Sequence, residues 1–211
     1  MVSVANASRI KRDRAGTEDG IVEAAKLVLA EEGFSAFGIN AIARRAGCDK
    51  QLIYRYFGGL DGLVDAIGND LADLFQELME EPGDSASVTY AAFVEHLVLA
   101  LLTAFRRSDL LLRIAAWEVL DPSPVTRRLA DVRGRALGAW IQARRGSLAV
   151  PGGVDSGAIN AVLIAAVQHL ALSARAVGGF SGVALDSDAD WQRIEDTLRT
   201  LVRNSYPEQR S

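Results

Sequence analysis

The sequence of 211 residues contains a single cysteine, and this scarcity excludes two kinds of site. Cys48 cannot form a disulfide within one chain, and one thiol cannot build a zinc site made of several cysteines. The near-absence of cysteine favours a reducing compartment. A small buried apolar side chain explains Cys48 more simply than redox sensing does.

Long hydrophobic runs are missing as well. The longest uninterrupted run near the C-terminal end, residues 161–167, is too short to cross a bilayer. No apolar core follows the charged residues near the N-terminus, as it would in a signal peptide. We therefore expect a soluble, cytoplasmic protein with no membrane partner. Hydrophobic residues still make up 49% of the chain, so it can bury a substantial core.

Histidine is also rare, and the motifs of common enzymes are absent. His96 and His169 each lie in an apolar stretch, where a lone histidine is usually a hydrogen-bonded core residue. The sequence has no Ser/His/Asp order, no HExxH motif, no glycine-rich phosphate loop and no cluster of metal ligands. We expect no enzyme, no catalytic residue, no metal and no cofactor. An all-helical enzyme remains the remote alternative, and it would need a convergent acid–base pair.

Charge is present in both signs but is unevenly distributed. The formal net charge is −4. Residues 1–60 hold 9 Lys/Arg against 7 Asp/Glu, whereas residues 61–211 hold 14 against 20. A mildly basic head on an acidic body is typical of a protein that touches DNA with one end only.

Residues 40–63 indicate a helix, a tight turn and a second, short helix. Apolar residues recur there at helical spacing, and Gly47 and Asp49 interrupt them. Gly47 can take a left-handed conformation at the end of the first helix, and Asp49 can accept from the free N–H groups that open the second. The second helix, residues 50–56, carries donors and a phenol on its outward face: Lys50, Gln51, Tyr54 and Arg55. Such side chains on an exposed helix suit base edges and phosphates.

Residues 21–63 resemble the DNA-binding domain of TetR/AcrR-type transcriptional regulators. The matching features are a helix ending in AEEGF, then I..IA..AG, then a short helix with IY.YF, and Leu63 opening the next helix. The resemblance implies an all-α chain of about nine helices. A three-helix helix-turn-helix DNA-binding domain at residues 17–62 would be followed by a helical ligand-binding and dimerisation domain at residues 63–211.

The resemblance and the outward face of the short helix together give the candidate DNA-binding residues. They are Gly38, Asn40, Arg44, Lys50, Gln51, Leu52, Tyr54, Arg55 and Tyr56. The chain departs from the family where Gly38 replaces a Thr or Ser that caps the helix and reaches a phosphate. Residues 58–60 likewise replace a segment with a phosphate-binding Lys, so we expect a lower salt dependence of DNA binding than a typical relative has.

Residues 1–16 form a basic arm, which we expect to be flexible because its residues are small, polar and then basic. Its cations could follow phosphates or enter a minor groove; they are Arg9, Lys11, Arg12 and Arg14. A solvated tail that only aids solubility is the alternative. We expect the first helix to begin after the arm, with Thr17 as its cap.

Helical periodicity and breakers divide the rest of the chain into further helices. We expect them at residues 60–80, 87–107, 109–120, 124–145, 155–177 and 188–205. The Glu80-Glu81-Pro82-Gly83 cluster should stop the first of these, which the resemblance makes the connector between head and body. We expect any signal from the body to pass along it. The last two helices have more apolar surface than the core of a single chain would bury. The resemblance implies that these two helices of each chain form a four-helix interface in a homodimer.

Together these patterns predict a homodimeric regulator of transcription. Its partners would be a near-palindromic double-stranded DNA operator and a small apolar or amphipathic effector that releases a repressor from DNA. We expect the effector pocket to combine apolar walls with a few polar groups. Its predicted lining is Phe75, Phe93, His96, Leu97, Phe105, Arg113, Trp117, Gln168 and His169. A ligand-independent regulator or an activator with the same fold remains open.

Overall fold

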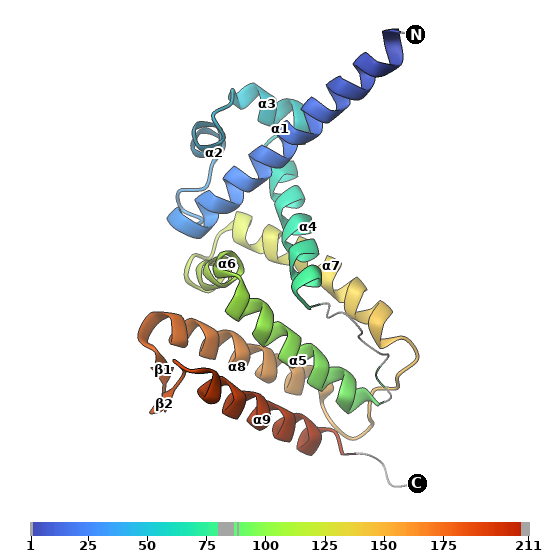
Figure 1. Cartoon of the computed structure of the whole chain (residues 1–211), viewed down its shortest axis with the longest axis vertical. Helices are drawn as coiled ribbons and strands as arrows, with labels where there is room; N and C mark the ends of the chain where they lie inside the picture. Colours follow the sequence, from blue (N-terminus) through green and yellow to red (C-terminus); the bar gives the residue numbers. More distant parts are fainter. Residues whose placement is uncertain (1, 80–86, 88, 208–211) are drawn as a thin grey trace. The chain divides into compact units, whose positions relative to one another are not determined.

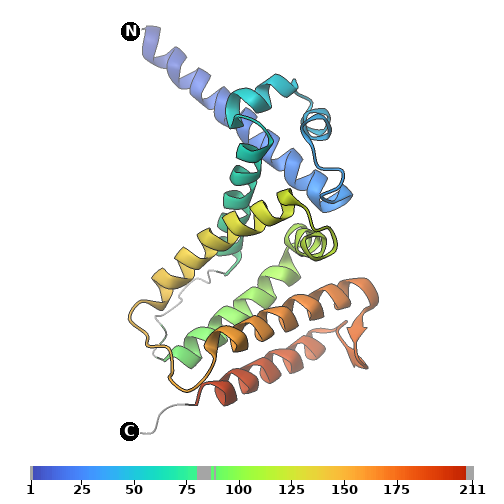
Figure 2. The same cartoon turned by 180° about the vertical axis from the view of Figure 1, so that it is seen from behind.

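The computed structural model describes residues 2–79, 87 and 89–207, and over these residues the chain forms nine α-helices and one small antiparallel hairpin (Figures 1 and 2). The helices are α1 (Val2–Glu32), α2 (Ile39–Ala46), α3 (Lys50–Phe57), α4 (Leu60–Met79), α5 (Tyr90–Arg107), α6 (Asp109–Leu120), α7 (Pro124–Arg145), α8 (Ser156–Val177) and α9 (Asp188–Ser205). The hairpin consists of β1 (Gly179–Phe180) and β2 (Val183–Ala184). The predicted all-α class, a helix-turn-helix head followed by a helical body, is confirmed.

Several predicted helix ends are confirmed because capping residues determine them locally. Both α6 and α9 have the predicted bounds. Before α9, the Ser187 hydroxyl accepts from the backbone N–H of Asp190 at 3.2 Å, and the Asp190 carboxylate accepts from the Ser187 N–H at 3.0 Å. This reciprocal pair is the expected capping box. The cluster predicted to stop α4, residues 80–83, lies outside the described residues.

The first helix begins far earlier than predicted. It starts at Val2 rather than at Thr17, so residues 2–16 of the predicted flexible arm are helical. No proline interrupts this stretch, and extending an existing helix is far less costly than nucleating one. The buried stripe that starts at Ile21 supplies the stable helix on which the earlier turns are added. The arm's contact with DNA remains a prediction, because the side chains of residues 2–15 are outside those described.

The chain divides into two compact units, which we describe separately. One contains residues 1–72 and 113–136, and the other contains residues 73–112 and 137–211. Helices α4, α6 and α7 each run through both units, so the packing boundary falls inside these helices. The domain boundary at residue 62, which the family resemblance implied, remains a prediction.

The first unit is organised around the packing of α1 on α2. Fully buried side chains of three helices fill the space between them; among these are Ile21, Ala25, Val28 and Leu29 of α1, Ile42 of α2 and Ile53 of α3. Phe34 and Phe37 close this core from the loop between α1 and α2. Lys26 is buried too, and its ammonium contacts the carboxylates of Glu23 and Asp70, which joins α1 to α4. Burial alone would lower the pKa of Lys26, but hydrogen bonds to the two carboxylates and their charges raise it.

The second unit packs α5 against α8 and α9. The apolar helix α5 contributes seven buried side chains, and the rings of Phe75 and Phe105 meet edge to face at 5.5 Å. Helix α8 buries only one stripe and leaves Val162 (68% exposed) and Ile164 (46%) in solvent. Of the helices searched among the described residues, only α8 is long and apolar enough to span a membrane by length and composition. An apolar helix with one open face is equally typical of a protein–protein interface.

The β1–β2 hairpin between α8 and α9 was not predicted. Its turn places Ser181 (φ +51°) and Gly182 (φ +79°) in the left-handed region, as two-residue hairpin turns require. Each strand has only two residues, so no alternating pattern reveals it in the sequence. Phe180 turns back onto α8, where its ring meets His169 edge to face at 4.6 Å.

Candidate nucleic-acid interface and effector site

The turn between α2 and α3 is built by the two residues that the sequence singled out. Gly47 ends α2 with φ +64°, and its N–H donates to the carbonyl of Arg44 at 3.3 Å. Asp49 caps α3, because its carboxylate accepts from the N–H of Gln51 at 2.8 Å. Ile53 is fully buried and holds α3 against the core. The rest of α3 is therefore oriented by one apolar side chain and one cap.

The predicted DNA-binding residues lie mainly on the outside of this pair of helices. Six of the nine side chains are exposed: Asn40, Arg44, Lys50, Gln51, Tyr54 and Arg55. Gly38, Leu52 and Tyr56 are half-buried. Gly38 caps α2 with its backbone alone, and no side-chain hydrogen bond forms there. The exposed hydrogen-bond donors predicted from the sequence therefore lie together on α2 and α3.

Two contacts stiffen the exposed surface. The Arg45 guanidinium binds the Glu31 carboxylate at 2.6 and 3.0 Å, so this arginine joins α2 to the end of α1. On α3, the Arg55 guanidinium carbon lies 5.7 Å from the centre of the Tyr56 ring, within the range of a cation–π contact.

The connection from α3 to α4 is unusually tight. Gly58 ends α3 with φ +74°, and its N–H donates to the Tyr54 carbonyl at 2.9 Å. A Cβ added at Gly62, in the first turn of α4, would lie only 1.9 Å from the carbonyl oxygen of Phe57. Gly62, rather than the glycines at positions 58 and 59, therefore allows the two backbones to approach closely.

Cys48 is half-buried in the turn between α2 and α3. Burial raises the pKa of its thiol, and the charge of Asp49 acts in the same direction. A raised pKa leaves the thiol protonated at neutral pH and therefore poorly nucleophilic. The environment of Cys48 suits the simpler interpretation of a small packed side chain.

The nine residues predicted to line an effector pocket are divided between the two units. Arg113 and Trp117 belong to the first unit and the other seven to the second. Within the second unit, Phe75, Phe93 and Phe105 are buried, whereas Gln168 and Leu97 are half-buried. His169 is exposed, contrary to the expectation of a core histidine, because α8 turns this face away from α5. It hydrogen-bonds to Ser173 at 3.3 Å.

One of those nine residues, His96, lines a cavity of about 800 Å³ in the second unit. Apolar and charged side chains of α5 and α9 share its wall, among them Glu95, Leu99, Arg199 and Arg203. Glu95 accepts from the Arg203 guanidinium at 3.1 and 3.3 Å. Tyr206 also lines the cavity; burial raises the pKa of its phenol to about 12, and the phenol donates to Asn160 at 2.8 Å.

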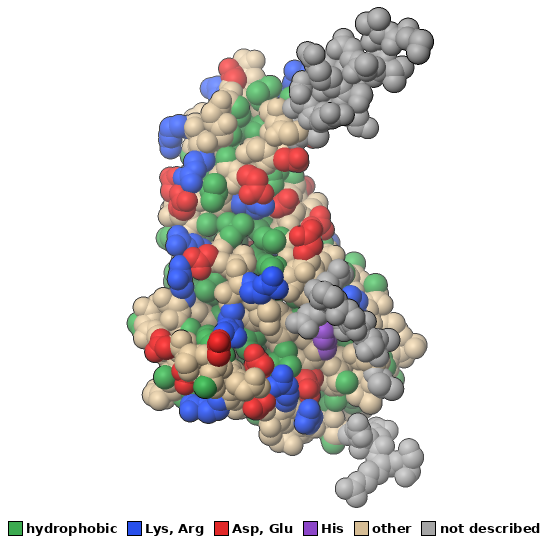
Figure 3. Space-filling model, in the orientation of Figure 1, with side chains coloured by type: hydrophobic (Ala, Val, Ile, Leu, Met, Phe, Trp, Pro, Cys, Tyr) green, Lys and Arg blue, Asp and Glu red, His purple; other side chains and the backbone are tan. Residues whose placement is uncertain are grey.

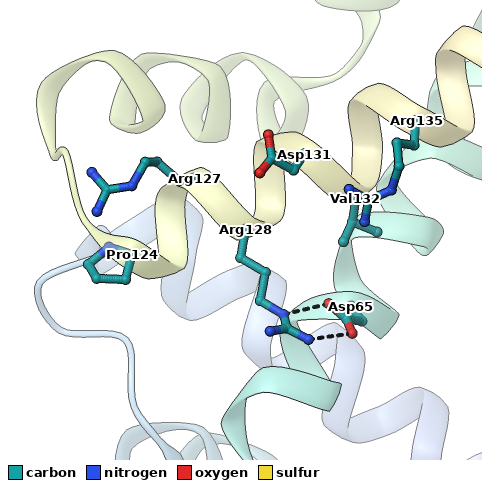
Figure 4. A pocket seen from close by; sticks show the side chains of 7 residues that line it. All are labelled: Asp65, Pro124, Arg127, Arg128, Asp131, Val132 and Arg135. Carbon is teal, nitrogen blue, oxygen red and sulfur yellow. Dashed lines mark hydrogen bonds and ion pairs between the residues drawn. The ribbon is translucent and has the colours of Figure 1, made fainter.

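A second cavity, of about 470 Å³, lies in the first unit between α4 and the start of α7 (Figure 4). Arg128 crosses it and binds both oxygens of Asp65 at 2.7 Å, and it also contacts Asp61 at 3.1 Å. Arg127 points away from this pair in Figure 4. Hydrogen bonding from Arg128 lowers the pKa of Asp65; burial opposes the shift, and the charges of Arg128 and Arg135 add to it.

The described residues contain no group of three or more His, Cys, Asp or Glu side chains that could hold a metal ion.

Lys/Arg and Asp/Glu side chains are interspersed over the face drawn in Figure 3.

The chain is similar to known regulatory proteins. Residues 21–67 match the profile of the bacterial regulatory proteins of the tetR family. The HTH-type transcriptional regulator AlkX of Mycobacterium tuberculosis is 28% identical over an alignment that covers 61% of this chain and 65% of that protein. This chain therefore spans just under two thirds of the length of that curated relative.

Solved structures agree with the fold. A TetR family transcription regulator from Marinobacter aquaeolei superposes with a TM-score of 0.59 at 17% identity, covering 93% of this chain and 97% of that one. The multidrug binding protein EbrR, complexed with imidazole, superposes with a TM-score of 0.57 at 14% identity, covering 92% and 97%. At these identities the likeness concerns the fold alone. Residues 21–67 thus carry the pattern of the tetR family's regulatory proteins, and the whole chain has the fold of solved members of that family.

Proposed function

We propose that this chain is a cytoplasmic, homodimeric transcriptional repressor that leaves its DNA operator when a small apolar or amphipathic effector binds. The observation that carries the proposal is the short, exposed α3 with its row of donors, held in a domain that matches the TetR family. The description of AlkX as an HTH-type transcriptional regulator supports the same conclusion.

In this proposal α3 enters the major groove, and its exposed side chains contact base edges and phosphates. Lys50, Gln51 and Arg55 are suited to base edges and phosphates, because they present N–H donors along one helix. The phenols of Tyr54 and Tyr56 suit phosphates. Asn40 and Arg44 assist from α2, and the backbone N–H groups after Gly38 can hold a phosphate at the start of that helix; Leu52 lies beside them on α3.

Dimerisation would use the faces of α8 and α9 that the chain's own core leaves open. Val162 (68% exposed), Ile164 (46%) and Leu201 (48%) lie on these helices. Two copies of both helices can form a four-helix bundle about a two-fold axis. A two-fold dimer presents two copies of α3, so the operator should be near-palindromic.

The effector would enter the second unit. The cavity beside His96, about 800 Å³, falls within the range of small-molecule sites and combines apolar walls with a few polar groups. Phe93 and Phe105 belong to the same helix as His96 and would add apolar surface if the cavity deepened. The similar fold of EbrR, described as a multidrug binding protein, supports an effector of mixed character. Release then follows if the effector binds one state of the protein more tightly than the DNA-bound state.

DNA binding is tested by selecting duplexes from a random pool with the full chain and measuring affinity at fixed salt with a polyanion competitor. We expect a near-palindromic sequence to be selected. Gln51→Ala should weaken binding to it by roughly 5- to 150-fold and relax preference at one base pair, as loss of a base contact does. Gln142→Ala, an exposed glutamine on α7, is the matched control and should leave affinity unchanged. Equal binding to all duplexes would contradict the proposal.

Effector control is tested with the selected duplex and a panel of apolar and amphipathic compounds. We expect at least one compound to release the wild-type chain from DNA. Ala92→Trp places an indole in the cavity beside His96 and should abolish that release while DNA affinity persists. Ala143→Trp, at an exposed alanine of α7, should respond as the wild type does. Release that survives Ala92→Trp would exclude this cavity as the effector site.

A further inference from the structure

Helix α6 contacts the DNA-binding head directly, through an aromatic ring at the end of α1. The indole of Trp117 lies over Gly33, the residue that directly follows α1. A Cβ added at Gly33 would lie 3.0 Å from Cδ2 and Cε3 of the indole and 3.1 Å from Cε2. The ring therefore occupies the space that any other side chain at this position would need.

Gly33 is required at this point for two independent reasons. Its φ is +78°, a left-handed conformation that side chains other than glycine rarely adopt, and its N–H donates to the Leu29 carbonyl at 3.2 Å to complete the helix. The contact with Trp117 adds a steric reason to the conformational one. Together they set how closely α6 approaches the end of α1.

Trp117 is held on a rigid support. The next residue, Glu118, binds the Arg133 guanidinium at 2.6 and 2.7 Å, and the two side chains are only 12% and 19% exposed. Such a bidentate, largely buried pair fixes geometry more firmly than an exposed ion pair. Ile114, three residues before Trp117, is fully buried. The turn of α6 that carries the indole is therefore held against α7.

The end of α1 is in turn joined to the helices that face DNA. Glu31 binds Arg45 of α2 through two hydrogen bonds. The hydrogen bond from Arg45 lowers the pKa of Glu31; burial opposes this, and the charges of Arg45 and Arg113 reinforce it. Arg113 lies on α6, so this helix contributes both a cation and an indole to the end of α1. Phe34 and Phe37, buried in the following loop, anchor the remaining connection to α2.

We infer that Trp117 is a positioning residue for DNA binding: it sets where α1 ends, and through α2 it sets the placement of α3. A shift of α6 then reaches the recognition helix through the contact between Trp117 and Gly33, without passing along α4. This inference rests on the proposed function. It differs from the sequence-based expectation that any signal from the body passes along α4, and the place of Trp117 in an effector pocket remains a prediction.

Simple burial of an indole against a glycine would also explain the contact, and it makes a different prediction. A ring that only fills space is indifferent to whether α3 has bound DNA. A ring that positions the head must change its surroundings when DNA fixes the head. The distinguishing measurement is therefore made on Trp117 itself, in the folded full-length chain, with and without DNA.

The chain has three tryptophans, so incorporation of 5-fluorotryptophan gives three ¹⁹F resonances. The signal of Trp117 is the one missing from a Trp117→Phe sample. We expect this resonance to shift on saturation with the selected duplex and to stay in place with a scrambled duplex of equal length and salt. An unchanged resonance at saturation overturns the inference while the proposed function stands. A chain that selects no duplex overturns the proposed function and this inference with it.

A double-mutant cycle supplies a second measurement that does not depend on labelling. Gly33→Ala should weaken binding to the selected duplex at least roughly tenfold, and this penalty should shrink at least roughly threefold when Trp117→Ala removes the indole. Gly153→Ala is the matched control, because Gly153 has φ +82° but no atom within 4 Å of an added Cβ. It should change affinity less than twofold. Circular dichroism establishes that every variant is folded, and an equal penalty in both backgrounds overturns the inference.

Discussion

Gly62 is the residue that allows α3 and α4 to meet so closely. An added Cβ would approach the Phe57 carbonyl oxygen to 1.9 Å, far inside any contact distance, and the atom it meets is backbone. A flexible neighbour could move aside, but a backbone carbonyl moves only with its helix. Only the hydrogen atom of glycine fits at this position, and a larger side chain would have to displace α3.

We predict that Gly62→Ala destabilises the folded chain by at least about 2 kcal/mol, as overpacking typically does, and abolishes specific DNA binding. Gly134→Ala is the matched control, since Gly134 also lies in a helix but has no atom within 4 Å of an added Cβ. That substitution should stabilise α7 by up to about 1 kcal/mol. Urea denaturation and binding to the selected duplex measure both effects. Equal stability of the two variants would show that α4 can shift to admit the methyl group.

At the scale of elements, α4 is held from two sides within the first unit. Lys26 of α1 contacts Asp70, whereas Arg128 of α7 binds Asp65 with two hydrogen bonds. Close packing supports the second side, because a Cβ added at Gly68 would lie 2.8 Å from a methyl carbon of Val132. The ion pair between Arg128 and Asp65 thus joins α4 and α7 where the two helices are already closely packed.

The pair between Arg128 and Asp65 makes part of the stability depend on pH. Arg128 lowers the pKa of Asp65 in the folded chain. The contribution is therefore complete above the ordinary aspartate pKa of about 3.9, and it is lost as pH falls through the lower folded value. Both side chains are 42% exposed, so solvent screens the pair and its contribution is modest.

We predict that Arg128→Ala lowers the free energy of unfolding at pH 7, by an amount near the upper end for exposed ion pairs because the contact is bidentate. The difference from wild type should narrow as pH falls to 3 and below. Arg127→Ala removes the same charge from the neighbouring position, which points away from Asp65, and should cost less (Figure 4). Urea titrations across this pH range test it. A difference that stays constant with pH would mean that Arg128 acts through packing instead.

At the scale of the whole molecule, the open apolar face of α8 is the main feature that one chain does not explain. Val162 is 68% exposed in the middle of this helix, where a monomer would leave it in water. A stable dimer typically buries about 1,200–2,000 Å² in total, which two helices from each copy can supply.

We predict that Val162→Asp converts the protein from a dimer to a monomer, because the substitution places an unpaired carboxylate in an apolar interface. Affinity for the selected duplex should fall at least roughly a hundredfold, since each monomer reaches only one half-site. Val119→Asp changes an equally exposed valine (73%) at the end of α6 and should leave the dimer intact. Sedimentation equilibrium measures the mass. A Val162→Asp chain that remains dimeric would place the interface elsewhere.

Local signals were sufficient for much of the fold. Gly47 and Asp49 identified the helix-turn-helix because a left-handed C-cap and a side-chain N-cap act within a few residues of themselves. Capping and periodicity likewise placed α6 and α9 correctly. The same signals placed the start of α1 at Thr17, which was wrong, because a good local cap does not stop a helix that can extend past it.

The sequence by itself determined the fold class, the short helix α3 and the residues exposed along it, because these depend on spacing within single helices. Only the tertiary structure decided which distant residues meet. It placed Trp117 against Gly33, exposed His169 on α8, and joined Arg128 to Asp65. Periodicity reports which face of a helix is apolar, but not which other helix covers that face, so contacts between residues far apart in the chain have no local signature.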